Sequence, residues 1–558
     1  MNQIYGYQVL PNDTAHPTFG LDGASPVQIP LSPNAVYPQI QTSAYPETTL
    51  RISYSPAHKS WVYIWGTPSH LEIAQAKIPD WCAKVVAEEQ YGKFKDLVGS
   101  FVIIVDEPNK PCLTFVSDIL GVRPMFLGKE NGRVIFGSKV WPMYRAGLIS
   151  GRINYDAVSA WINYGFNCTN GSLFADLQRM PPGSVVVIKN AEWNEISYAR
   201  FEEKGPLLPI DQVVEELHEI VASTLKVLLA DVPQATFALS GGYDSRYLLA
   251  LALSLSKTAI QCRTVSISKE EEGIASQVAN AIGVPLETVP IHNSEWDLYD
   301  EAFHLTADGF PITKFLTYCL ANRHSKVPML NGYMGDSLMR GSKDMFQGKY
   351  EEEWTGDFVE ILQRKHSFIS FIGMRRDIAQ KIQMRSRLPM EQAVREGSEI
   401  GKIFGWADFY FRQRLYISNN FLQHLDFAEA LLPFYSWKLL SYKMHHNSRL
   451  FSPEVYEQIF TKYFPVLSRI PRADTLPRKK SPHSNVANCT KQWARNLLPV
   501  MCSRKRLALL DRNWCAPRTL AGLAGFRRYE GTIRNFQRLY LLEETVRAAG
   551  LNFDWEHI

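Results

Sequence analysis

The stretch TFALSGGYDSRYLLALALSL, residues 236–255, contains the pattern that decides the fold. An apolar, strand-like run over 236–239 is followed by SGGYDS at 240–245, and the apolar run that comes next predicts a buried helix. A strand that ends in Ser-Gly-Gly and opens a helix brings several backbone N–H groups and the positive helix end to one point. The stretch therefore predicts a phosphate-binding turn at the end of a strand.

The side chains of this turn indicate which kind of phosphate it binds. Gly241 and Gly242 allow close backbone approach, and Ser240 and Ser245 add hydroxyl donors. A carboxylate such as Asp244 is out of place against a bare phosphate, so we expect it to bind Mg²⁺ that bridges to the phosphates. The chain contains no Walker motif, GxxxxGK followed by Ser or Thr.

The chain around the turn alternates between helical and strand-like segments. A helical pattern covers 211–229, the strand-like RTVSI covers 263–267, and the helical SQVANAI precedes another strand-like segment near Val289. This alternation is typical of a parallel α/β sheet, and beyond about Glu352 the pattern becomes mostly helical.

The first 200 residues have a different texture. Short β-type runs, the clearest at 101–105, 112–116 and 184–188, alternate with turn residues and predict stacked sheets with a few helices. A chain of 558 residues exceeds what one core usually supports, so we expect two domains, 1–205 and 210–558.

Bulk composition excludes several classes of protein. The net charge of +4 does not favour a nucleic-acid-binding protein, and no apolar run approaches the roughly 20 residues of a membrane span. The eight cysteines include no CxxC pair, so we expect reduced thiols rather than disulfides or a zinc site. The N-terminal residues lack a signal-peptide pattern, and we expect a cytoplasmic protein.

The SGGxDS turn after a strand resembles that of the PP-loop ATP pyrophosphatases, and the surrounding sequence resembles the asparagine synthetase superfamily. Residues 117–124 (SDILGVRP) are similar to that family's RDxxGxRPL, and Phe136-Gly137-Ser138 is similar to its FaSE turn. Residues 173–174 with 181–183 resemble its TLF…LpPG. The resemblance implies a glutaminase-type, Ntn-hydrolase-like sandwich of stacked β-sheets, followed by a PP-loop α/β synthetase domain with a helical C-terminal part.

The nucleophile of the glutaminase fold is not found in this sequence. Family members that hydrolyse glutamine have a cysteine after the initiator Met, whereas this chain has Asn2 and its first cysteine is Cys82. An amide cannot replace a thiolate, so we expect an inactive, scaffold-like first domain. This resembles two offshoots of the family, the β-lactam synthetases and the lasso-peptide cyclases, which close a ring with an amine already present in the substrate.

A second motif implies the other half of a metal site. Residues 330–337 (LNGYMGDS) resemble the family's LSGEGxDE, and Asp336 falls on its magnesium-binding Asp, which would act together with Asp244. The segment departs from the family pattern at Tyr-Met, 333–334, where the family has Glu-Gly, and at Ser337, where it has Glu.

Two further motifs imply catalytic residues. Residues 429–434 (EALLPF) resemble the family's ExRxPFLD, which makes Glu429 a candidate for orienting or deprotonating the amine. The Arg478-Lys479-Lys480 run resembles its RxK segment, whose lysine faces the α-phosphate; Lys480 is the predicted residue and Lys479 the alternative.

Three residues complete the predicted nucleotide site. We expect the adenine near Val265, at the end of the 263–267 strand, and Gly335 beside the phosphates. Glu272 resembles the family's DE…A segment near the nucleotide.

The reaction that the resemblance implies is the ATP-dependent formation of an amide. The substrate carboxylate attacks the α-phosphate of ATP, pyrophosphate leaves, and an amine then attacks the acyl-adenylate. Three interpretations of the substrate remain open: macrolactam closure of a lasso peptide, a small-molecule synthetase of the β-lactam or ammonia-dependent asparagine type, or an inactive assembly subunit. The first implies a precursor peptide, a leader-peptide-binding protein and a leader peptidase as partners, in the biosynthesis of a ribosomal peptide antibiotic.

Overall fold

The structure is a computed structural model of the chain. It describes residues 50–107, 112–130, 132–189, 192–201, 207–265, 269–289, 306–310, 327–340, 356–366, 376–399, 401–426 and 428–471, together with 5–7, 110 and short pieces between 494 and 553. Asn2, Lys479 and Lys480 lie outside the described residues.

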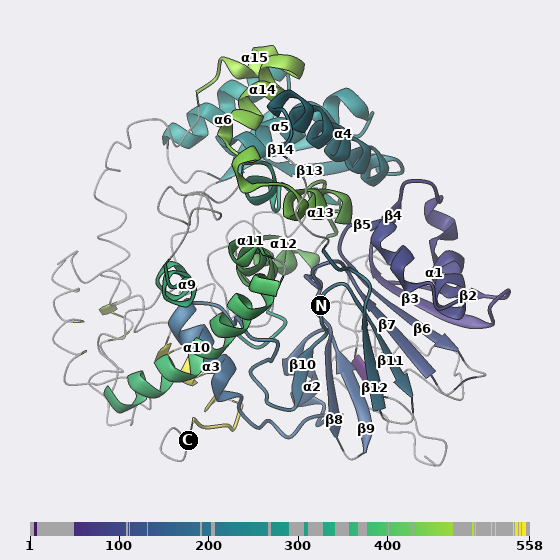
Figure 1. Ribbon diagram of the computed structural model, residues 1–558, viewed down its shortest axis with the longest axis vertical. Coiled ribbons are helices and arrows are strands. Elements are labelled where there is room, and N and C mark those ends of the chain that lie inside the picture. Colours follow the sequence, from purple (N-terminus) through teal and green to yellow (C-terminus); the bar gives the residue numbers. More distant parts are fainter. Residues whose placement is uncertain are drawn as a thin grey trace.

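The first part of the chain forms two stacked antiparallel sheets (Figure 1). The larger sheet has the strand order β12 (Glu192–Ser197), β11 (Ser184–Lys189), β7 (Cys112–Ser117), β6 (Phe101–Glu107), β3 (Ser60–Gly66) and β2 (Leu50–Ser55). The smaller one has the order β1 (Tyr5–Tyr7), β9 (Arg133–Gly137), β8 (Phe126–Glu130) and β10 (Leu177–Arg179), and β4 (Ser69–His70) pairs with β5 (Leu97–Val98).

The predicted run at 101–105 shows why these sheets stack. Every residue of the run is buried, but successive side chains point to opposite faces of β6. Val102 and Ile104 join the core between the two sheets, where Phe115 of β7 and Phe136 of β9 pack edge to face. Ile103 faces the other way, into a core shared with α1 (Ile78–Ala87). Two short helices, α2 (Val140–Arg145) and α3 (Tyr155–Tyr164), complete this part.

The second part contains a five-stranded sheet in which every pair of strands is parallel. Its order is β15 (Leu286–Val289), β14 (Ala259–Val265), β13 (Gln234–Ala238), β16 (Met329–Leu330) and β17 (Ala430–Leu431). Its helices are α4 (Ile210–Leu229), α5 (Tyr243–Leu255) and α6 (Lys269–Ile282), which lie around β13 and β14 at the top of Figure 1. The prediction of a parallel α/β sheet is confirmed.

The C-terminal part is mostly helical within the described residues, as predicted. Its elements are α9 (Phe358–His366), α10 (Arg376–Glu399), α11 (Ile403–Ala407), α12 (Asn419–Leu422), α13 (Trp437–His445), α14 (Pro453–Tyr463) and α15 (Pro465–Ser468). Two segments, η3 (Asp336–Arg340) and η6 (Asp408–Ile417), are π-helical, which is rare and often occurs at functional sites.

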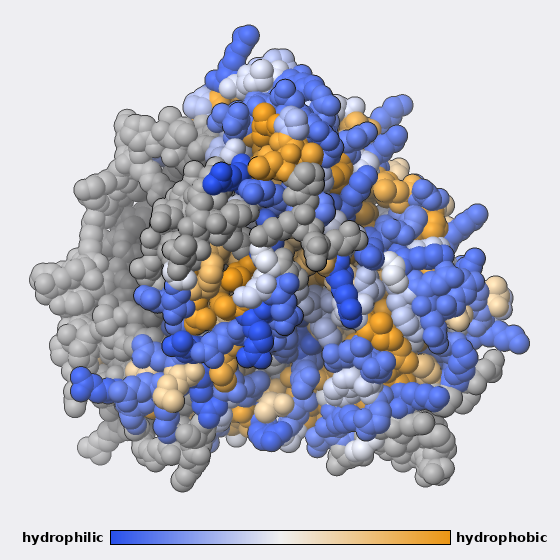
Figure 2. All heavy atoms as spheres, in the orientation of Figure 1, coloured by the Kyte–Doolittle hydropathy of each residue, from blue (hydrophilic) through white to orange (hydrophobic). Residues whose placement is uncertain are grey.

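None of the described helices is both long and apolar enough to cross a membrane, and Figure 2 shows hydrophilic side chains over much of the coloured surface on this face. The described cysteines are all free: Cys82, Cys112, Cys168, Cys262 and Cys515.

A buried carboxylate joins the two parts of the molecule. Asp118, directly after β7, accepts hydrogen bonds from the backbone N–H groups of Phe101, Val122 and Arg123 and from the hydroxyl of Tyr435. The same Tyr435 oxygen accepts from the N–H of Leu120 at 2.9 Å. Asp118 is fully buried, so each of these bonds replaces hydration that the carboxylate has lost.

We therefore expect Asp118→Ala to destabilise the protein strongly. The substitution leaves three buried N–H groups and one tyrosine hydroxyl without their acceptor, which should lower the free energy of unfolding by about 3–5 kcal/mol. Urea denaturation measures this change. Asp156→Ala is the matched control, because the Asp156 ion pair with Arg385 is half-exposed and should contribute less than about 1 kcal/mol. Equal losses in the two variants would contradict the assignment.

Candidate functional site

The glycine turn lies at the point where the order of strands in the parallel sheet reverses. After β13 the chain continues through β14 and β15 on one side, and β16 and β17 then add on the other side of β13. Ligands of open α/β sheets bind at the carboxyl ends of the strands at such a reversal. Gly241 and Gly242 follow β13 at this edge and lead directly into α5.

The two serines of the turn hold its backbone in place. The Ser240 and Ser245 hydroxyl oxygens lie 2.9 Å apart, and the Ser245 hydroxyl donates to the Ser240 carbonyl at 3.1 Å. The N–H of Gly242 donates to the Ser240 hydroxyl at 3.2 Å. The turn therefore keeps its shape through internal hydrogen bonds, and its remaining N–H groups and the start of α5 form the anion-binding end.

Sequence reasoning missed Arg246, which supports the turn from behind. Its side chain is fully buried and donates to the carbonyls of Gly241, Ile470 and Pro471, the last two at 2.6 and 3.0 Å. The only signal in the sequence is a basic residue at the start of an otherwise apolar helix. Arg246 thus fixes the end of the described segment after α15 beside the glycine turn.

Asp336 follows β16, the strand next to β13, and lies close to Asp244. Between β16 and Asp336 lies Gly335, whose position requires a glycine. A Cβ atom added to Gly335 would lie 2.8 Å from Cγ of Asp244 and 2.7 Å from the ring of Phe434, closer than such contacts occur. The structure therefore brings the two predicted metal-binding aspartates together.

The turn before Asp336 has an unusual backbone. Met334 has φ of 69°, in the left-handed region where glycine is favoured and a long side chain is strained. The family motif has glycine at this position, and the structure shows why. Tyr333, where the family has Glu, is buried against the rings of Phe421 and Tyr435. No carboxylate therefore reaches the site from position 333.

Electrostatics at the two aspartates fit a divalent cation. Burial, together with the nearby charge of Asp336, raises the pKa of Asp244 from 3.8 to about 7, while the Tyr456 hydroxyl and Arg340 partly oppose this rise. Oδ1 of Asp244 is enclosed and receives no well-formed hydrogen bond from the described residues. Two close carboxylates with an unsatisfied oxygen are a suitable donor set for Mg²⁺, which takes one or two carboxylates plus phosphate oxygens.

The metal site would be completed by ligand oxygens. Within the described part of the chain, no group of three or more His, Cys, Asp or Glu side chains could hold a metal ion by itself. Mg²⁺ usually keeps water or phosphate oxygens in its coordination shell, so two protein carboxylates are sufficient.

The other predicted nucleotide contacts lie at the same edge of the sheet. Ala238 pairs with Arg263 in the register of β13 and β14, which puts Val265, the last residue of β14, level with Ser240. Glu272 lies on α6, just after β14, and accepts a hydrogen bond from Thr288 at 3.2 Å.

Glu429 occupies a different place from the aspartates. It precedes β17, whereas Asp244 and Asp336 follow β13 and β16, so in a parallel sheet Glu429 lies toward the opposite end of the strands. It is 3% exposed and pairs with Arg123 of the first part at 2.7 Å. The Arg123 guanidinium also stacks on the ring of Trp65. A role of Glu429 toward the amine stays a prediction, and its position favours a contact between the two parts.

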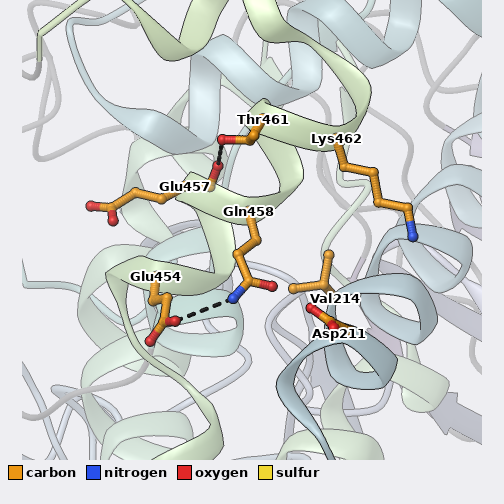
Figure 3. Close-up of a pocket in the computed structure, with 7 residues that line it drawn as sticks. All are labelled: Asp211, Val214, Glu454, Glu457, Gln458, Thr461 and Lys462. Atoms are coloured by element: carbon orange, nitrogen blue, oxygen red, sulfur yellow. Dashed lines mark hydrogen bonds between the residues drawn. The ribbon is translucent and has the colours of Figure 1, made fainter.

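An open groove lies elsewhere on the second part, between α4 and α14 (Figure 3). It has a volume of about 440 Å³ and contains none of the predicted site residues. Its lining is mostly charged or polar and comprises Asp211, Val214, Glu454, Glu457, Gln458, Thr461 and Lys462. The nucleotide site is therefore assigned from the sheet topology and the glycine turn.

Comparison with known families divides the chain at the same place as the sheets. Residues 84–199 match the glutamine amidotransferase domain family, and residues 215–512, just over half of the chain, match the asparagine synthase family.

Individual relatives are distant. Asparagine synthetase [glutamine-hydrolyzing] 1 of Bacillus subtilis is 24% identical over 50% of this chain and 44% of its own length. Asparagine synthetase [glutamine-hydrolyzing] 3 of the same organism is 26% identical over 41% of this chain and 34% of its own length. The matches thus span less than half of either relative. The structure of a glutamine phosphoribosylpyrophosphate amidotransferase from B. subtilis aligns with 54% of this chain and with 61% of its own chain, at 10% sequence identity. The TM-score of this alignment is 0.18, which indicates no close structural similarity.

The aspartate pair predicts a specific pH dependence. The pKa of Asp244 is about 7 in the folded protein, whereas an ordinary aspartate, as in the unfolded chain, has a pKa of 3.8. Between these two pH values the folded state binds more protons than the unfolded state. The free energy of unfolding of the metal-free protein should therefore fall as pH rises from about 4 to about 7. Mg²⁺ competes with this proton, so metal affinity should rise over the upper part of the same window. Asp336→Asn removes the neighbouring charge, so it should flatten the stability profile and weaken Mg²⁺ binding at least about tenfold. Thermal melts with and without Mg²⁺ at several pH values measure both effects; an unchanged profile would contradict the pairing.

A pair of variants separates the two roles open to Glu429. Glu429→Leu alone leaves Arg123 buried without its partner and should lower the free energy of unfolding by about 3–5 kcal/mol. The double variant Arg123→Met/Glu429→Leu should recover most of this loss, as measured by denaturation. If Glu429 only joins the two parts, the refolded double variant regains activity. A stable but inactive double variant would instead support a role toward the amine.

Proposed function

This chain belongs to the asparagine synthase family, and on that premise we propose that it is an ATP-dependent ligase that activates a carboxylate and joins it to an amine. The observation that carries the proposal is the glycine turn at the strand-order reversal, with Asp244 and Asp336 beside it. A bare phosphate-binding turn would need no carboxylates, whereas a turn for Mg²⁺-bound ATP does.

The residues of the site suit the activation step. The N–H groups around Gly241 and Gly242 and the start of α5 are suited to bind phosphate oxygens of ATP, and Asp244 and Asp336 would hold Mg²⁺. A metal ion held there would supply positive charge to offset that of the pyrophosphate leaving group. An oxygen of the substrate carboxylate bonds to the α-phosphorus while the bond from that phosphorus to the pyrophosphate oxygen breaks, which gives an acyl-adenylate.

The second step transfers the acyl group to an amine. The nitrogen attacks the acyl carbon, loses a proton, and AMP leaves. Lys480, or Lys479, is proposed to stabilise negative charge on the α-phosphate. The assignment rests on the resemblance of residues 478–480 to the family's RxK segment, because both lysines lie outside the described residues.

The source of the amine decides the substrate class. Burial raises the pKa values of Cys82, Cys112 and Cys168, the described cysteines of the first part, so none of them supplies a thiolate for glutamine hydrolysis. We therefore propose that the amine belongs to the substrate, as in closure of a lasso-peptide macrolactam between an N-terminal amine and an Asp or Glu side chain. The replacement of the family's Glu by buried Tyr333 supports a substrate unlike aspartate. Free ammonia or a β-lactam precursor would be the small-molecule alternative.

Pyrophosphate chemistry tests the ligase. Wild-type protein with a suitable carboxylate substrate should release pyrophosphate from ATP, and Asp244→Ala should lower this rate by at least about a hundredfold, because phosphate charge then lacks one metal-binding carboxylate. Asp211→Ala, in the groove between α4 and α14, is the control and should match wild type. Equal rates in Asp244→Ala and wild type would reject the ATP site, and no release with any carboxylate would favour an inactive assembly subunit.

Mass spectrometry tests the substrate class. A precursor peptide incubated with ATP and the enzyme should lose the mass of one water if a ring closes. An unchanged peptide, under conditions where a small-molecule carboxylate releases pyrophosphate, would reject the cyclase and favour the small-molecule synthetase.

A further inference from the structure

A buried hydrogen bond connects the metal-binding turn to the π-helix η6. The side-chain amide of Gln413 donates to the hydroxyl of Ser337 at 2.6 Å. Gln413 is 1% exposed and Ser337 is 3% exposed, so water cannot readily replace either partner. Ser337 is the residue directly after Asp336, at the position where the family motif has Glu.

Ser337 passes this restraint on to the neighbouring carboxylate. Its backbone N–H donates to Oδ1 of Asp336 at 2.9 Å. A carboxylate with one oxygen held by an N–H group has a fixed orientation, and its second oxygen stays available to a metal ion. The position of Asp336 therefore depends on Ser337, and that of Ser337 on Gln413.

We propose that Gln413 is a positioning residue for the metal site, acting on Asp336 through Ser337. The inference rests on the proposed role of Asp336 in binding Mg²⁺. Removing a residue that hydrogen-bonds to a metal ligand typically lowers metal affinity by about 10- to 100-fold. The Gln413–Ser337 bond is neutral and does not touch Asp336 directly, so its removal should have a smaller effect.

The neighbours of Gln413 on η6 explain why this helix is a firm support. Arg414 is fully buried and donates to Oδ1 of Asn170 and to the carbonyl of Met180, both at 2.9 Å. Both acceptors belong to the first part of the chain. On the other side of Gln413, Arg412 pairs with Asp408 of the same helix at 3.0 Å.

The first part of the molecule thereby contributes to the metal site through η6. Asn170 and Met180 accept hydrogen bonds from Arg414 of η6. Gln413, the residue before Arg414, donates to Ser337 in the turn that carries Asp336. Adjacent residues of a helix point in different directions, which lets one helix contact both parts. A domain with no chemistry of its own would still be needed for metal binding.

The test measures the Mg²⁺ concentration that gives half-maximal binding of a non-hydrolysable ATP analogue, by calorimetry. Gln413→Met keeps the length of the side chain but removes the amide, and it should raise this concentration about five- to tenfold. Ser337→Ala removes the same bond from the other side and should give a similar shift. The double variant should add little to either single change, because both remove one interaction.

The matched control breaks a similar bond elsewhere. Asn163→Leu removes a buried amide-to-hydroxyl bond, from Asn163 to Ser386 at 2.9 Å, between α3 and α10. In Figure 1 these helices lie far below β13 and α5. This variant should lower stability but leave the Mg²⁺ requirement within twofold of wild type.

The outcomes separate the inference from the proposed function. If Asp336→Ala binds Mg²⁺ and nucleotide as wild type does, the metal assignment itself is wrong, and the inference fails with it. If Asp336→Ala is defective while a folded Gln413→Met or Ser337→Ala keeps the wild-type Mg²⁺ requirement, only the inference is overturned. A shift in both single variants, absent from Asn163→Leu, supports it.

Discussion

The contact between Asp118 and Tyr435 is the constraint on which the relation of the two parts depends. Asp118 has no exposure to water and takes all its hydrogen bonds from the protein, one of them from a residue more than 300 positions away. A buried carboxylate is stable only when its oxygens are satisfied, so the segment that carries Tyr435 has to stay against β7. Phe434, the residue before Tyr435, lies against Gly335 next to Asp244.

This arrangement gives the first part a structural role in the molecule. Arg123 with Glu429, Asp118 with Tyr435, and Arg414 with Met180 each bury a charged group at the boundary of the two parts. Removing one side of such contacts leaves an uncompensated buried charge, which is strongly destabilising. The second part, if separated from the first, would expose these groups together with the cores that they cover.

Local sequence patterns predicted many of the strands and helices. Contacts between residues far apart in the sequence could not be predicted in this way. The apolar run at 101–105 lies in β6, and 236–238 lies in β13. Residues 246–255 lie in α5, which is buried up to Ala252, whereas Leu253 and Leu255 are exposed. These elements could be predicted because hydrophobic periodicity and turn residues indicate local structure directly. The helix predicted from residue 211 begins at Ile210, and the strand expected at 263–267 is described from Ala259 to Val265. In the site, SGGYDS indicated the turn and the aspartate, Asp244, that lies close to Asp336. Arg246 and Gln413 could not be found, because Arg246 depends on Ile470 and Pro471, 224 and 225 positions away, and Gln413 on Ser337, 76 positions away. The π-helical turns have no sequence period that distinguishes them from α-helix.

The candidate site is also where the chain departs from what stability alone favours. Asp244 and Asp336 place two carboxylates side by side in a partly buried site, and Met334 holds a left-handed backbone where glycine would be unstrained. Local rules are broken mostly at functional sites, where a ligand restores the balance. Mg²⁺ would turn the repulsion between the aspartates into shared coordination, and phosphate oxygens would fill the remaining positions around the metal. A purely structural turn would gain nothing from either feature. The strain and the repulsion therefore favour a binding site over a glycine-capped strand end.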